Sequence, residues 1–311
     1  MAIFCLFACA LLAADGEAPL TKTALGTDEA GDRWPKAYQW ESARYVLRTD
    51  VPEREGEELI RSLDRLQSAF FEEFAEIIPE ERLEEKLVVY FYGDHKRFES
   101  SIKKVHPGME LSDGFVNTGD NIAHLFRIET KLKGAVVPDR ESMFHECTHQ
   151  LMNTLLGGER DSAGRPHFWA VEGIACLFES LDIDNDTHTI GKRLPGRFRV
   201  VEQAAARLKK IRLADFLQMT QKEMLSASGD PKAPETNYIY ASLLSYYLCA
   251  VGDGKYKRSF LTYVREIYRG KAKSSTFDET IGLEVEGLET DLRQFIDRIG
   301  KEIDRNERQR E

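Results

Sequence analysis

Two short segments constrain the fold of this chain more than any other part of its 311 residues. They are His-Glu-Cys-Thr-His at positions 145–149 and Trp-Ala-Val-Glu-Gly at positions 169–173. In an α-helix, residues four positions apart lie on the same face, so the imidazoles of His145 and His149 can reach one point. Glu146 lies about 100° around the same helix from His145, so its carboxylate can come close to that point without pointing directly at it.

The surrounding sequence predicts that both segments are helical. Apolar residues recur at helical spacing over 143–156, and a second helical pattern covers 168–180 after Pro166. Glu172, in the second helix, follows His149 by enough residues for a loop and an antiparallel return. Two histidines and one glutamate that leave a fourth position open are typical of a catalytic zinc site.

A zinc ion at this point would lower the pKa of a water molecule, and Glu146 would accept the proton. We therefore expect one Zn²⁺ per chain, bound by His145, His149 and Glu172, with Glu146 as a catalytic residue. The alternative is that both histidines are satisfied by hydrogen bonds in the core and that Glu146 is a surface carboxylate.

The pair H-E-C-T-H and W-A-V-E-G-I-A resembles the gluzincin metallopeptidases, the thermolysin-like and aminopeptidase-like superfamily. The nearest likeness is to small secreted bacterial proteins of unknown function with a peptidase-like domain. The resemblance covers roughly residues 42–298. It implies the same roles: His145, His149 and Glu172 as zinc ligands, and Glu146 as the general base.

Many of these resembled proteins also carry Tyr-Ala-x-Ser after the ligand glutamate, which corresponds here to Tyr240-Ala241-Ser242. The resemblance implies that Tyr240 donates a hydrogen bond to the oxyanion. Tyr238 lies nearby, but residues two apart cannot both face the metal from a regular helix. The alternative for either tyrosine is packing in an aromatic-rich helix.

Glu179 follows Glu172 by seven residues, which places both on one helix face. It either orients a ligand histidine or is a solvated carboxylate near the helix end.

Two family patterns are absent. The chain lacks the G-x-M-E-N segment with which zinc aminopeptidases hold a substrate amine, and the N-E-x-x-S-D run of thermolysins is missing around Glu172. The choice between cutting chain ends and cutting inside chains therefore stays open.

Composition and charge limit the possible partners. The chain is 42% hydrophobic and 31% charged, with a formal net charge of −10 and no basic stripe, so nucleic acid is not an expected partner. Residues 1–14 form an apolar run ending in small residues, which predicts a signal peptide and an extracytoplasmic, secreted or periplasmic location. The alternatives are a buried N-terminal helix and lipoprotein anchoring at Cys9. The run is too short for a stable membrane span.

Beyond this leader only three cysteines remain, so no disulfide framework is expected, although a Cys147–Cys176 bridge is an open alternative.

The pattern along the chain predicts an α+β fold, in which a small mixed β-sheet lobe with crossover helices precedes a mainly helical lobe, as in zincins. We expect a linker or tail over 15–41, a single gluzincin-like catalytic domain over 42–300, and a charged tail over 301–311. Within the domain, 42–135 form the sheet lobe and 136–300 the helical lobe.

In the sheet lobe, strands are expected at 45–48, 87–92, 114–116 and 121–129, with a helix over 55–78 between the first two strands, which would then be parallel. The resemblance implies that the last of these strands edges the cleft and pairs with extended substrate. The alternative is an ordinary half-buried strand. After residue 192 the pattern is mainly helical, with helices expected over 199–209, 213–225, 237–251, 256–269 and 286–304.

The function that these features favour is an exported zinc-dependent metallopeptidase acting on a peptide or protein substrate. Two alternatives stay open: an extracytoplasmic zinc-binding interaction module without turnover, and a zinc hydrolase of a non-peptide amide. The sequence does not indicate the oligomeric state.

Overall fold

In the computed structural model the described residues are 19–78, 85–132, 135–156, 165–184, 187–191, 195–227 and 229–308. The predicted signal peptide over 1–14 lies outside them. Within the described part of the chain, no helix combines the length and the apolar character needed to cross a bilayer.

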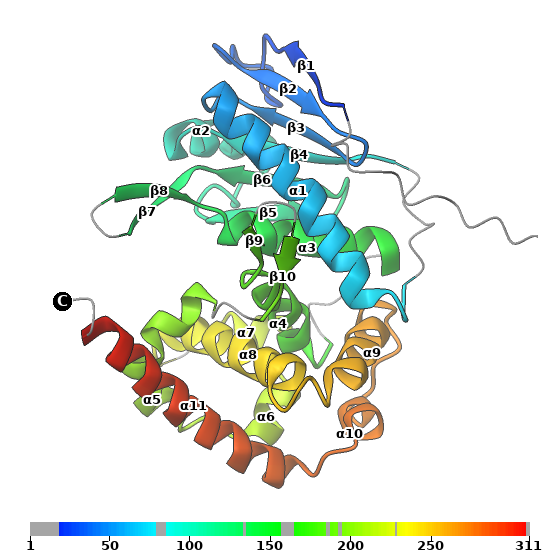
Figure 1. Ribbon diagram of the computed structural model, residues 1–311, viewed down its shortest axis with the longest axis vertical. Helices are drawn as coiled ribbons and strands as arrows, with labels where there is room; N and C mark the ends of the chain where they lie inside the picture. The colour runs from blue at the N-terminus through cyan, green and yellow to red at the C-terminus, as the bar shows by residue number, and fades with distance from the viewer. Residues whose placement is uncertain are drawn as a thin grey trace, which may run out of the picture.

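The fold is α+β, as predicted, with a mixed sheet and a helical lobe (Figure 1). The sheet has the strand order β1-β2-β3-β4-β6-β5. Strands β3, β4 and β6 are parallel to one another, and the other neighbours pair antiparallel. The strands are β1 (Thr21–Ala24), β2 (Tyr38–Glu41), β3 (Tyr45–Thr49), β4 (Leu87–Tyr92), β5 (Gly114–Asn117) and β6 (Ile122–Phe126).

Helices cover both faces of the sheet and form the lobe below it in Figure 1. They are α1 (Glu53–Phe74), α2 (His95–Val105), α3 (Glu141–Leu156), α4 (Phe168–Phe178), α5 (Val201–Leu208), α6 (Leu213–Leu217), α7 (Gln221–Met224), α8 (Ala233–Ala250), α9 (Lys257–Tyr268), α10 (Thr276–Ile281) and α11 (Val285–Arg308). A 3₁₀ turn, η2, covers Gly196–Val200, and two small hairpins pair β7 (Ile128–Leu132) with β8 (Ala135–Asp139) and β9 (Asp182–Asp184) with β10 (Thr187–Thr189).

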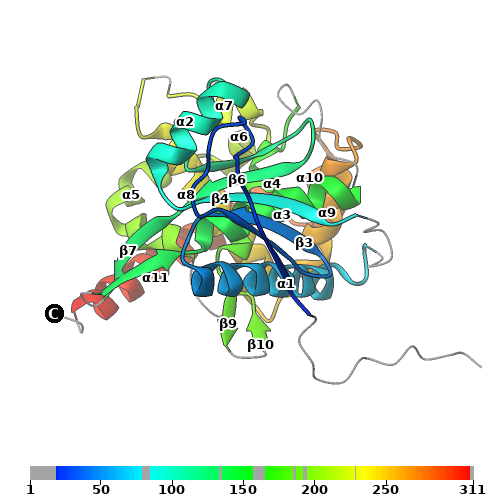
Figure 2. The same cartoon turned by 90° about the horizontal axis from the view of Figure 1, so that it is seen from above.

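The side chains of β4 contribute alternately to two hydrophobic cores, one on each face of the sheet, because successive side chains of a strand point to opposite faces. Val89 and Phe91 belong to the main core, which α1, α3 and the helical lobe share. Tyr90 and Tyr92 belong to a smaller core with Phe98 of α2. Helices α1 and α2 therefore lie on opposite faces of the sheet, as Figure 2 also shows. Helix α3, which carries residues 145–149, lies on the same face of the sheet as α1.

The expected linker over 15–41 is wrong for its described part. Strands β1 and β2 extend the sheet at the β3 edge, and Trp34 is buried against Tyr90 and Tyr92. All four residues of β1 are exposed, so this strand has no alternation of apolar and polar residues that a sequence pattern could reveal.

Two other expected elements are divided in the structure. The strand expected over 121–129 ends at Phe126, and residues from Ile128 onwards belong to the separate β7–β8 hairpin. The expected helix over 213–225 is interrupted at Thr220, whose side chain forms a capping box with Glu223 and starts α7.

Helix α4 is buried along its whole length and crosses α8 closely. Gly173 makes this crossing possible, because a Cβ atom there would clash with Oγ of Ser245 and lie 3.2 Å from the carbonyl oxygen of Ala241. Trp169, four residues earlier, is fully buried and stacks on Phe260. The close crossing and the aromatic contact together fix the helix that carries Glu172.

We predict that Gly173→Ala destabilises the protein by about 1–3 kcal/mol, the usual cost of overpacking a core, because α4 and α8 must separate. Urea unfolding followed by circular dichroism measures the change. Gly300→Ala is the matched control: Gly300 lies inside α11 with no atom near its missing Cβ, so alanine there should stabilise by up to about 1 kcal/mol. Equal effects of the two substitutions would contradict this account of Gly173.

Candidate metal centre

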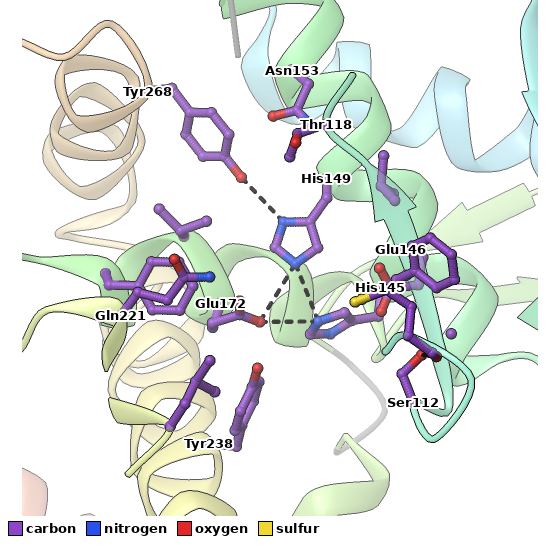
Figure 3. A pocket seen from close by; sticks show the side chains of 17 residues that line it. Ser112, Thr118, His145, Glu146, His149, Asn153, Glu172, Gln221, Tyr238 and Tyr268 are labelled. Carbon is purple, nitrogen blue, oxygen red and sulfur yellow. Dashed lines mark hydrogen bonds and ion pairs between the residues drawn. The ribbon is translucent and has the colours of Figure 1, made fainter. Parts of the chain in front are cut away.

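Three side chains from α3 and α4 converge at one point (Figure 3). Nε2 of His145 lies 3.2 Å from Nε2 of His149 and 3.2 Å from Oε2 of Glu172. Nε2 of His149 lies 3.5 Å from Oε2 of Glu172. Tetrahedral zinc with bonds of about 2.0–2.1 Å separates its ligand atoms by about 3.3 Å. The three atoms thus have the spacing of three corners of such a tetrahedron, and these residues fit a metal ion.

The second nitrogen of each imidazole is occupied. Nδ1–H of His145 donates to Oε1 of Glu179 at 2.8 Å, and Nδ1 of His149 lies 3.2 Å from the hydroxyl of Tyr268, with which it forms a hydrogen bond. The carboxylate contact fixes the tautomer in which Nε2 of His145 has a free lone pair for a metal ion, and the hydroxyl contact is compatible with the same tautomer of His149. Without a metal ion, protons on the imidazoles would have to supply the positive charge between these three atoms.

Glu179 therefore orients His145 and is not the solvated carboxylate that was the alternative. It is buried and also accepts two contacts from Nε of Arg197, at 2.8 and 3.0 Å. Burial alone would raise the pKa of Glu179, but the Arg197 charge and the hydrogen bond with His145 lower it. The carboxylate stays ionised and strengthens His145 as a ligand.

Glu172 is also held in its ionised form. Burial acts to raise its pKa, but the charges of His149 and His145 and their hydrogen bonds outweigh burial and hold the pKa far below the usual range. An ionised carboxylate is the form that binds a divalent cation.

Cys176 lies on the far side of His145, with its sulfur 3.9 Å from Nδ1. His145, Cys176 and Glu179 are close enough to form a second metal-ligand set, but the Arg197 guanidinium already neutralises Glu179 there. A cation on that side would meet this positive charge. Cys147 and Cys176 are both buried free thiols, so the alternative of a bridge between them is wrong.

Glu146 points into a pocket of about 390 Å³ that also exposes His145, His149 and Glu172. Burial raises the pKa of Glu146, and the neighbouring histidines oppose this only in part. A raised pKa makes a carboxylate a better proton acceptor at neutral pH. Gly114 lies beside it: a Cβ there would be 3.4 Å from Cγ of Glu146.

Strand β5 forms the edge of the sheet at this pocket. Gly114, Phe115 and Val116 line the pocket, and β5 pairs only with β6 among the strands of the described sheet. The expected edge strand over 121–129 is therefore wrong in position. Its main part, β6, is internal, because it pairs with β4 on one side and β5 on the other.

The structure does not bring Tyr240 to the pocket. Its side chain is 1% exposed and packs on Phe216, with ring centroids 4.7 Å apart, on the other side of α8. Tyr238 lines the pocket, and its hydroxyl points toward the three ligand atoms in Figure 3. The prediction of Tyr240 as the residue at the metal is thus wrong, because residues two apart on a helix point in nearly opposite directions.

Arg197 and Tyr268 were not predicted as parts of this site. Arg197 lies on η2 and Tyr268 at the end of α9, both far from the motif in sequence. Neither belongs to a spacing pattern with the ligands, so only the packing of the helical lobe reveals their contacts.

No family model matches the chain, and comparison with curated proteins gave no match.

We predict that Glu179→Gln lowers the zinc affinity by about 10- to 100-fold, because the amide loses the charge that orients and polarises His145. Competition with a chromophoric chelator measures the affinity. Glu202→Gln, on the exposed face of α5, is the matched control and should leave the affinity unchanged. An unaltered affinity in Glu179→Gln would show that this contact does not support the metal ligands.

Proposed function

We propose that this protein is a zinc-dependent metallopeptidase. The observation that carries the proposal is the tetrahedral spacing of the ligand atoms of His145, His149 and Glu172, beside a free carboxylate, Glu146, in an accessible pocket. Two histidines and one carboxylate leave a coordination position open, which distinguishes catalytic from structural zinc sites.

In the proposed mechanism, His145, His149 and Glu172 would hold a zinc ion, which would supply a Lewis acid that lowers the pKa of a water molecule and polarises the substrate carbonyl. Glu146 accepts a proton from the attacking water, which its raised pKa favours, and then returns this proton to the leaving amine. Glu179 holds His145 in the required tautomer, and the contact with Tyr268 helps to hold the ring of His149 in place.

Tyr238 is the residue placed to donate a hydrogen bond to the oxyanion. Burial, and then the charge of Glu172, raise the pKa of Tyr238, so its hydroxyl stays protonated. The Arg197 guanidinium lies 5.2 Å from the centre of the Tyr238 ring and limits how the ring can turn. A fixed, half-buried donor is most effective when negative charge develops beside it.

The pocket walls favour an extended peptide as the substrate. The free edge of β5 offers backbone groups to an added strand. Phe168, Val171 and the exposed side chains of Met109 and Leu225 give the pocket an apolar part, which fits an apolar side chain next to the scissile bond. The apolar run over 1–14 supports the proposal that the protein acts outside the cytoplasm.

We predict that Glu146→Gln keeps its zinc and loses about 10²- to 10⁴-fold in hydrolysis, because the amide cannot accept the proton. Metal content by mass spectrometry and cleavage of a mixed peptide library measure the two properties. The chelated wild type should lose cleavage and regain it on zinc addition. A zinc-loaded wild type without chelator-sensitive cleavage would instead favour a binding module, and full turnover in Glu146→Gln would refute the assigned base.

We also predict that Tyr238→Phe lowers kcat by about 10²- to 10³-fold with little change in zinc content, because one oxyanion donor is removed. Tyr240→Phe removes the same atom two residues along α8 and should keep wild-type kcat. Equal kcat values for the two variants would exclude Tyr238 from the reaction.

A further inference from the structure

A second group of metal-ligand side chains lies on the other face of the sheet. His124 points from β6 into the smaller core, His106 caps the end of α2, and Glu29 lies in the loop between β1 and β2. The neighbouring β6 residues Ala123 and Leu125 point to the main core, where α3 lies. The sheet therefore separates this group from His145, His149 and Glu172.

The ligand atoms of this group face one another without forming hydrogen bonds. Nδ1 of His124 lies 3.4 Å from Oε2 of Glu29, and Nε2 of His106 lies 3.6 Å from Oε1 of Glu29. One ligand atom from each residue can be chosen so that all three lie within 4.8 Å of one another. These nitrogens and Oε2 of Glu29 are buried without a hydrogen-bond partner.

His124 is the fixed member of the group. Its side chain is fully buried between the rings of Tyr90 and Phe115, which stack on it at centroid distances of 5.5 and 4.9 Å. Both of its ring nitrogens lack a hydrogen-bond partner. A buried polar group left unpaired costs about 1–3 kcal/mol, and a ligand bound at Nδ1, the nitrogen that faces Glu29, would remove this cost for one of the two nitrogens.

A cation suits this group as a ligand, because the Glu29 carboxylate lies between the two imidazoles. Asp120 adds negative charge near Glu29 and Arg48 adds positive charge, whereas the nearby Asp28 is already paired with Arg97, at 3.7 Å. The side chains of Glu29 and His106 are 18% and 17% exposed, so an ion can reach them from solvent. A small rotation of either side chain can bring its ligand atom into bonding range of the ion. Two imidazoles and a carboxylate suit zinc and similar transition-metal ions better than calcium or magnesium.

We propose that Glu29, His106 and His124 form a second divalent metal site, of the zinc-preferring class, independent of the site in the pocket. A metal ion here links the loop before β2 and the end of α2 to β6. Phe115 of β5 stacks on His124, and its neighbours Gly114 and Val116 line the pocket. The ion would thus brace the edge strand from the face opposite α3.

The test uses the full chain, stripped of metal with a chelator, dialysed against zinc and analysed for metal per chain. Wild type should bind about two zinc ions, His106→Ala about one and Glu172→Gln about one, while the double variant should bind none. His95→Ala, which removes an exposed histidine from α2, is the matched control and should still bind two. Both His106 and Glu29 are partly exposed, so Glu29→Gln serves as a second variant that keeps the core intact.

Hydrogen exchange adds a readout that does not depend on activity or on the pocket. Zinc should slow exchange of the backbone amides over 26–34 in wild type and in Glu172→Gln, but not in His106→Ala. A Glu172→Gln variant that binds no zinc, or His106→Ala and Glu29→Gln variants that both bind as much zinc as wild type, would overturn the proposal. Zinc binding by Glu172→Gln reports on the second site alone, because the pocket site has lost a ligand. A failure of this proposal can therefore be distinguished from a failure of the proposed peptidase site.

Discussion

The structure depends on the convergence of three electron-rich atoms from two helices. His145, His149 and Glu172 place ligand atoms within 3.5 Å of one another, an arrangement that is unfavourable unless a metal ion, or protons on the imidazoles, supply positive charge between them. Much of the helical lobe serves to hold this arrangement. Gly173 lets α4 approach α8, Trp169 anchors α4 among aromatic rings, and the contacts at the far side of each imidazole fix its orientation.

The sequence predicts the parts of this site that depend on local geometry. The spacing within 145–149 already implies two imidazoles on one face of a helix, and the structure places Glu172 beside them, as predicted. Sequence reasoning fails where side chains meet through packing. Tyr238 and Tyr240 occupy one helix, and only the position of α8 against α4 decides which of them reaches the pocket.

The N-terminal part of the described chain shows the same limit for the fold. The strands and helices with strong periodicity, such as α1 and β4, lie close to their predicted bounds. Strand β1 has no buried residue, and its pairing with β2 becomes apparent only when the sheet is assembled. Glu29, His106 and His124 are separated in sequence without a motif, and tertiary structure alone brings them together.

Strand β5 has a consequence for what the proposed enzyme can accept. It is only four residues long, and in an antiparallel pair alternate residues direct their backbone groups away from the neighbouring strand. The open edge can thus form main-chain hydrogen bonds with only a very short stretch of a substrate chain, and that stretch must be extended. Compact proteins hide their backbone in their own helices and sheets, so unfolded segments, frayed ends and short peptides would be accessible to this site while intact domains would be spared.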